Sequence, residues 1–154
     1  MLMVIDKRIP VEAKNKLLLY GEVVEFATSN ITDEAISGHP DIFFCQTSRN
    51  LIAAPNLPVL MKDKLVKRGV HLKMGDHSVG EKYPDNSHYN VASTNKFLVH
   101  NIRFTDPAVL SLYQHLEIIQ VAQGYTRCNL IALDEFHFIT SDRGIEKSLN
   151  NKYI

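Results

Sequence analysis

The sequence predicts an α/β fold built from a repeated strand–strand–helix–strand (ββαβ) unit. A single domain, residues 1–154, is expected to carry this unit about three and a half times. Three observations support this prediction. A chain of 154 residues has the length of one domain. Its composition, 45 % hydrophobic and 22 % charged, is ordinary for a globular protein. Short apolar runs and amphipathic stretches recur in the same order, and self-similarity of this kind indicates a repeat architecture.

The first complete unit follows a proline-containing loop. Its expected elements, with a polar break at Thr47–Arg49, are strands at 41–46 and 50–56, a helix at 57–68 and a strand at 70–74. Polar breaks between short apolar runs are typical of hairpins. Gly69 stands where a helix would end in a left-handed residue, a conformation that favours glycine.

Two later segments repeat this order. The second unit is expected to contain strands at 90–93 and 96–101, a helix at 106–115 and a strand at 117–121. The third is expected to contain strands at 128–133 and 137–140, ending at Asp142, and a helix at 144–153. Asp106 and Pro107 are typical of a helix start, an N-cap acid followed by proline at the first helical position.

The N-terminus fits part of a fourth unit, with a strand at 3–6, a helix at 11–20 and a strand at 22–26. A polar residue then closes the second strand of every unit, and these residues are Asp6, Asn56, Asn101 and Asp142.

Hairpin geometry predicts how these polar residues meet. The start of one antiparallel strand lies beside the end of its partner, so we expect Asp41 beside Asn56, Asn90 beside Asn101, and Cys128 or Asn129 beside Asp142. If the units pack around an axis, the polar pairs gather at one end of a shared channel and form a ligand site. The candidate substrate-binding residues are Asp41, Asn90, Asn101, Asp142 and His39, which enters the first unit with Pro40. The alternative is that such residues only cap turns.

Cys128 is the candidate nucleophile, because the cation of Arg127 beside it would favour the thiolate. His100 ends a strand and could face Cys128 as general acid or base. The alternatives are an incidental thiol and a capped, half-exposed histidine. Cys45, within an aromatic run, is expected to be a small core residue.

Other classes of protein lack their signals. Histidines and acids show no recognised ligand spacing, so no metal site is predicted. Glycine-rich phosphate motifs are absent, so no cofactor is predicted. Lys plus Arg equals Asp plus Glu, 17 against 17, which argues against nucleic-acid binding. No apolar run approaches the roughly 20 residues of a membrane span. Two cysteines without a Cys-x-x-Cys motif, and no secretory signal pattern, indicate a cytoplasmic protein without membrane partners.

Several motifs resemble an uncharacterised family of bacterial proteins with no assigned activity. They are Gly38-His-Pro-Asp-Ile42, Ala54-Pro55-Asn56, Gln123-Gly124-Tyr125 with Cys128, and Ile139-Thr-Ser-Asp142 with Gly144-Ile145. The resemblance covers nearly the whole chain.

The order of the units also resembles the pentein (α/β-propeller) superfamily, which modifies guanidines with a cysteine nucleophile, a histidine and substrate-holding carboxylates. This resemblance implies a partial α/β propeller. The chain has three and a half units where a closed pentein has five, and its motifs do not match the catalytic His or Cys motifs of that superfamily.

Two functions follow from these observations. The first is a non-catalytic module that binds a small polar molecule or takes part in assembly, as a homo-oligomer that covers the open strand edges. The alternative is a cysteine-dependent hydrolase or amidinotransferase-like enzyme acting on a guanidino or amide compound. In that enzyme Cys128 would attack, His100 would move the proton, and Asp41 and Asp142 would hold a cationic substrate.

Overall fold

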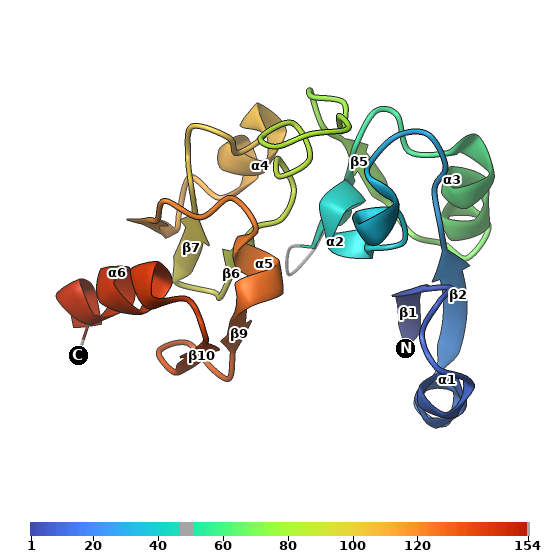
Figure 1. The fold of residues 1–154 in the computed structure, drawn as a ribbon, viewed down its shortest axis with the longest axis horizontal. Helices are drawn as coiled ribbons and strands as arrows, with labels where there is room; N and C mark the ends of the chain where they lie inside the picture. Colours follow the sequence, from blue (N-terminus) through green and yellow to red (C-terminus); the bar gives the residue numbers. More distant parts are fainter. Residues whose placement is uncertain (47–50, 154) are drawn as a thin grey trace.

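The computed structural model describes residues 1–46 and 51–153. In this part of the chain the protein is a mixed α/β structure with four small sheets and six α-helices (Figure 1). The predicted polar break at Thr47–Arg49 lies outside the described residues. The predicted mixture of strands and helices is confirmed.

A parallel strand pair opens the chain. Strand β1 (Leu2–Asp6) pairs with β2 (Glu22–Phe26), and helix α1 (Val11–Leu18) connects them. The helix begins where the sequence predicts and ends two residues earlier. It buries none of its residues and lies at the edge of the molecule (Figure 1).

The first three-stranded sheet has the order β3 (Phe44–Gln46), β4 (Leu51–Ala53), β5 (Leu72–Met74). The first pair is antiparallel and the second is parallel. Helix α3 (Val59–Val66) makes the crossover. Gly69 follows it with φ at +77°, which confirms the predicted left-handed position.

The second three-stranded sheet has the same order and the same strand senses. Strand β6 (Ala92–Ser93) is antiparallel to β7 (Phe97–His100), which is parallel to β8 (Glu117–Gln120). Helix α4 (Pro107–Leu112) is the crossover, and it ends three residues earlier than predicted. The Ala108 N–H donates to the Asp106 carboxylate at 2.9 Å, which confirms the predicted N-cap.

The last elements form a hairpin and a helix. Strand β9 (Leu130–Ala132) pairs antiparallel with β10 (Phe138–Thr140), and helix α6 (Arg143–Tyr153) follows. A single helical turn, α5 (Thr126–Asn129), precedes β9.

Two predicted strand starts were wrong, because a helical turn stands at each. The segment predicted as strand 41–46 begins with α2 (Pro40–Phe43), which follows a short 3₁₀ helix at Glu34–Ile36. Pro40 is the first residue of α2, where its fixed φ suits a helix and its missing N–H costs nothing. The segment predicted as strand 128–133 begins with α5. Asn90 accepts the N–H groups of Arg127 and Cys128 there, and so stabilises the turn.

Strand β7 lies between two hydrophobic clusters. Leu98 belongs to the larger cluster, which also includes residues of β2, α2, β3, β4 and α3. Phe97 and Val99 belong to the smaller one, with Leu130 and Ile145. Successive side chains of a strand point to opposite faces, so β7 is covered on both faces and all four of its residues are buried.

The chain runs from β1 and β2 on one side of the molecule to α6 on the other, and α2 and α5 approach each other near the middle (Figure 1). The four sheets of the described residues close into neither a barrel nor a propeller. The pentein-like arrangement therefore stays a prediction.

Candidate ligand-binding site

Three polar residues from distant parts of the chain meet where α2 and α5 approach each other. The Cys128 thiol donates to Oδ2 of Asp41 across 2.9 Å. Asp41 is half-buried and Cys128 is exposed to solvent. The contact joins the two single-turn helices that replace the predicted strand starts.

Asn90 holds Asp41 and Cys128 in place through hydrogen bonds to both residues. Its side chain is fully buried, and Nδ2 donates to the Cys128 sulfur at 3.2 Å and to the Asp41 backbone carbonyl at 3.3 Å. Its Oδ1 accepts the Cys128 N–H at 3.2 Å, and its carbonyl accepts the Arg127 N–H at 3.0 Å. One amide thus binds both helices, which makes Asn90 the positioning residue of the site.

His39 completes the group. One ring nitrogen of His39, a carboxylate oxygen of Asp41 and the sulfur of Cys128 all lie within 4.8 Å of one another. The His39 backbone N–H donates to Ile36 at 3.0 Å. Among the described residues, no hydrogen bond engages the ring itself. We call His39, Asp41, Asn90 and Cys128 the α2–α5 cluster.

Gly38 brings the chain close to strand β1 just before His39. A Cβ atom at Gly38 would collide with the carboxylate of Asp6. Arg8 holds that carboxylate with an ion pair at 2.6 Å, so Asp6 cannot move away freely. Only glycine therefore allows the chain to pass there and to deliver His39 to the cluster.

The surroundings of Cys128 disfavour the thiolate form of its side chain. Loss of hydration around the sulfur, followed by the charge of the Asp41 carboxylate, raises its pKa to about 12, although the residue as a whole is exposed. The cation of Arg127 acts in the opposite direction, as the sequence suggested, but it is a minor influence. The neutral thiol is therefore the form present near pH 7.

His100 is engaged elsewhere. It is fully buried, its Nε2 donates to the Gly124 carbonyl at 2.7 Å, and its Nδ1 lies 2.6 Å from the Thr105 hydroxyl. Burial lowers its pKa to about 4, so the ring is neutral and Nδ1 accepts. Both ring nitrogens have partners, and neither partner is Cys128. The histidine that lies beside Cys128 is His39.

Asn101 and Asp142 form their hydrogen bonds with residues outside the α2–α5 cluster. Asn101 donates to the Ala122 carbonyl at 3.1 Å, and its oxygen accepts from Arg103 and Gln120. Asp142 caps α6, because its Oδ1 accepts the Ile145 N–H at 2.8 Å. That bond is the main reason why the pKa of Asp142 is lowered. Their roles in substrate binding stay predictions.

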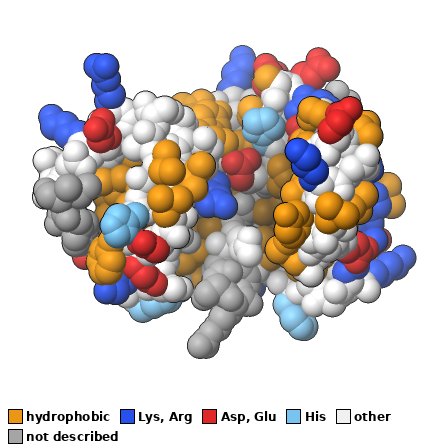
Figure 2. All heavy atoms as spheres, turned by 90° about the horizontal axis from the view of Figure 1, so that it is seen from below, with side chains coloured by type: hydrophobic (Ala, Val, Ile, Leu, Met, Phe, Trp, Pro, Cys, Tyr) orange, Lys and Arg blue, Asp and Glu red, His pale blue; other side chains and the backbone are white. Residues whose placement is uncertain are grey.

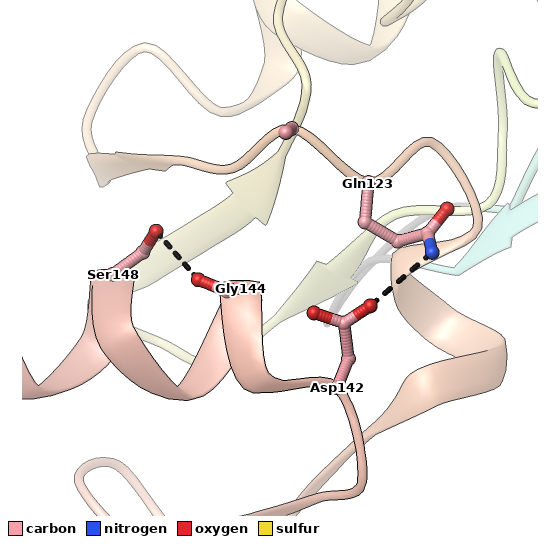
Figure 3. Close-up of a pocket in the computed structure, with 5 residues that line it drawn as sticks. Gln123, Asp142, Gly144 and Ser148 are labelled. Atoms are coloured by element: carbon pink, nitrogen blue, oxygen red, sulfur yellow. Dashed lines mark hydrogen bonds between the residues drawn. The ribbon is translucent and has the colours of Figure 1, made fainter.

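Asp142 lines a separate, open pocket of about 310 Å³ (Figure 3). The Gln123 amide points toward Asp142 from the loop after β8 and donates to it at 3.4 Å, while Ser148 donates to Gly144 one turn along α6. These polar groups are bonded to one another, so the pocket offers few free groups to a ligand.

Cys45 lies in the core, as the sequence predicts for a small apolar residue. It is 2 % exposed, and burial raises its pKa to about 12.

Asp106 has a role that the sequence did not reveal. Besides capping α4, this fully buried carboxylate accepts from the backbone N–H groups of Asp76 and His77 and from the Tyr89 hydroxyl. Burial alone would raise its pKa, but the N–H donors hold it below the ordinary value. An Asp-Pro pair signals a helix start, and no local pattern signals the distant donors.

The surface carries charges of both signs. On the face drawn in Figure 2, Lys and Arg side chains are interspersed with Asp and Glu, and they form no continuous basic area. Within the described residues, no helix is long and apolar enough to span a membrane.

These observations define a class: a mixed α/β protein with small sheets and a His–Asp–Asn–Cys cluster between two single-turn helices. Residues 4–154 match the model of DUF6873, a family of unknown function, and the chain belongs to this family. This agrees with the resemblance to an uncharacterised family. No curated protein and no solved structure matches the chain.

Proposed function

We propose that this protein is a non-catalytic binding module that holds a small polar molecule with a cationic group in the α2–α5 cluster. One observation carries the proposal. Asp41, Asn90 and Cys128 come from three separate parts of the chain, and direct hydrogen bonds join them at 2.9 to 3.3 Å. Convergent polar groups on a rigid base are typical of ligand sites.

The charge of the cluster favours a cationic ligand. Within residues 1–46 and 51–153, no Lys or Arg forms an ion pair with Asp41. A guanidinium or ammonium group could therefore form a charge-assisted hydrogen bond with its carboxylate. Asn90 holds the Asp41 backbone in place, so the carboxylate does not need to be ordered when the ligand binds.

The enzymatic alternative rests on a different observation. A ring nitrogen of His39 lies within 4.8 Å of the Cys128 sulfur, and a movement of the His39 side chain into hydrogen-bond distance would make it the proton acceptor. The pair would then act on a guanidino or amide carbon. Against this alternative stands the raised pKa of the Cys128 thiol, since activated cysteines have lowered values. We therefore prefer the non-catalytic binding module to the enzyme as the function of this protein.

The repeat and the single domain are part of this proposal. The sheets β3–β4–β5 and β6–β7–β8 share strand order and strand senses, which supports repeated ββαβ units. Strand β7 contributes residues to both hydrophobic clusters, which supports one domain. We propose a pentein-like relationship on this topology alone.

Calorimetric titration with arginine, agmatine and simple amines, in the presence of a chelator, tests ligand binding. We expect saturable binding that Asp41→Asn weakens at least tenfold. Asp63→Asn, which changes an exposed carboxylate of α3 in the same way, should leave the affinity unchanged. Equal effects of the two substitutions would contradict the proposal. Turnover of a guanidino compound that Cys128→Ser abolishes would establish the enzyme instead.

Assembly is the second candidate function, and the β9–β10 hairpin favours it. Ile131 and Ile139 face each other across the two strands and are 59 % and 54 % exposed. Both complete sheets have a third, parallel strand, and β9–β10 has none among the described residues. A second copy of the chain would cover this apolar face. Light scattering should show a dimer that Ile139→Lys dissociates, and a monomer at high concentration would exclude it.

A further inference from the structure

We propose that the α2–α5 cluster binds a divalent transition-metal ion of the zinc type through His39, Asp41 and Cys128. The proposal rests on the proposed function in one respect, namely that this cluster is a binding site, and it changes the chemistry of the ligand. No metal site was predicted from the sequence, because no recognised ligand spacing is present in it. The ligands proposed here escape such a pattern, since Cys128 lies 87 residues from Asp41 in the chain.

The donor set selects the kind of ion. Imidazole nitrogen, carboxylate oxygen and thiolate sulfur together are the ligands of Zn²⁺ and Co²⁺. Calcium and magnesium prefer sites made of oxygen alone. Here all three donor types lie within 4.8 Å of one another, so one ion can contact all of them.

The distances need only a small adjustment. In a tetrahedral zinc site with ordinary bond lengths, neighbouring ligand atoms lie about 3.5 Å apart. The Cys128 sulfur and Asp41 Oδ2 are closer, at 2.9 Å, and the most distant pair of the three is no more than 4.8 Å apart. Rotation of the His39 side chain can shorten its own distances to the other two ligands, because no hydrogen bond with a described residue restrains its ring. The Cys128 sulfur and Asp41 Oδ2 must move apart by about 0.6 Å, which the loss of the thiol proton between them favours.

Asn90 provides the outer support that a metal ligand needs. Its Nδ2 donates to the Cys128 sulfur at 3.2 Å, and its Oδ1 accepts the N–H of the same residue. A donor of this kind orients a metal-bound thiolate and stabilises its charge. Because Asn90 is fully buried, this support is rigid.

The site is open on one side. Cys128 is exposed, and His39 and Asp41 are half-buried. Three protein ligands leave a fourth position for water or for a donor group of a small molecule, as in zinc sites that are not purely structural. When the ion binds, a metal–sulfur bond replaces the bond between sulfur and hydrogen, and the proton passes to the solvent.

Titration of the full chain with Co²⁺ and then Zn²⁺ tests the site. Co²⁺ should bind one to one with a thiolate-to-cobalt charge-transfer absorption, and Zn²⁺ should displace it. Cys128→Ser should abolish this absorption. His39→Gln and Asp41→Asn should each weaken binding at least tenfold, whereas His115→Gln, the same change at an exposed histidine, should have no effect. Circular dichroism confirms that each variant is folded.

The outcomes separate the two proposals. Absence of the charge-transfer absorption, or equal Co²⁺ affinity in Cys128→Ser and the unaltered protein, would overturn the metal site. Binding of a guanidino compound in the presence of chelator would then leave the proposed function standing alone. If the protein binds Zn²⁺ but binds none of the guanidino compounds and amines, the metal site stands and the organic-ligand proposal is wrong.

Discussion

The Cys128 thiol donates to the Asp41 carboxylate across 2.9 Å, although 87 residues separate them in the chain. Each residue lies on a single helical turn that directly precedes a strand, β3 after α2 and β9 after α5. The contact therefore joins two segments in each of which a helical turn leads directly into a strand. Neither helix has enough residues to be stable alone, so the contact and Asn90 contribute to holding both turns.

The two cysteines should react differently with iodoacetamide. Cys128 is exposed and Cys45 is 2 % exposed, so we expect native protein to be alkylated at Cys128 alone, and at Cys45 only after unfolding. Because the pKa of Cys128 is raised to about 12, labelling at pH 7 should be slower than that of free cysteine. Asp41→Asn removes the nearby charge and should accelerate it.

Mass spectrometry of the digested protein measures the rates of alkylation at Cys128 and at Cys45. Asp63→Asn is the control for Asp41→Asn. Labelling of Cys128 faster than that of free cysteine would contradict the binding module and favour the enzyme.

Substitution of Asn90 by alanine should destabilise the protein by about 2–3 kcal/mol. The change leaves the Cys128 N–H and the Asp41 carbonyl, which the Asn90 side chain now satisfies, without these partners, and such groups cost free energy. Urea denaturation measures the effect. Asn95→Ala, at an exposed position, should cost less than half as much. Equal losses would show that Asn90 does not position the cluster.

Stability should fall with acid between pH 6.5 and about 4 because of His100. Its pKa is lowered from 6.5 to about 4 in the folded protein, so in this range the unfolded chain binds the extra proton. The contribution of neutral His100 is thus complete above pH 6.5 and is lost as pH falls toward 4. The difference corresponds to about 3 kcal/mol.

Thermal melts at several pH values, compared with His100→Gln, test this expectation. The variant should lose most of the pH dependence in this range, and His115→Gln should keep it. An identical slope in His100→Gln would assign the acid sensitivity to other groups.

Asp106→Ala should be more damaging than the loss of a helix cap alone. The buried carboxylate accepts from the backbone of Asp76, His77 and Ala108 and from the Tyr89 hydroxyl. The three backbone N–H groups would lose this partner, whereas the Tyr89 hydroxyl also donates to the His77 carbonyl. We expect a loss of about 3 kcal/mol or more, against about 1 kcal/mol for an ordinary N-cap. Asp33→Ala, at the exposed cap of the 3₁₀ helix, is the matched control in urea denaturation.

Much of the secondary structure could be predicted because its signals are local. Pro107 after Asp106 identified the start of α4, and Gly69 identified the end of the preceding helix. The hairpin registers also agree with the sequence, since Phe44 pairs with Ala53 and Ala92 with Val99. The starts of β3 and β9 were wrong because Pro40 and the distant acceptor Asn90 favour helical turns there.

The candidate site could be predicted only in part. His39, Asp41, Asn90 and Cys128 were all named from the sequence, because polar residues at the entry of each unit are visible in it. Their grouping differs from the prediction, since Asp41 contacts Cys128 and Asn90, and His100 bonds to Gly124. Hairpin geometry relates residues within one unit, and it carries no information about contacts between units.

The sequence by itself determined the α/β class, the order of the strands and of the longer helices α1, α3, α4 and α6, the burial of Cys45 and the polar residues available for a site. Tertiary structure alone decided which of them meet. Asp41 and Cys128 come together because α2 and α5 approach each other on either side of Asn90. His100 is not part of the α2–α5 cluster, because its ring nitrogens are bonded to Thr105 and Gly124. Local patterns record the short-range preferences of the chain, whereas a site depends on how distant segments pack.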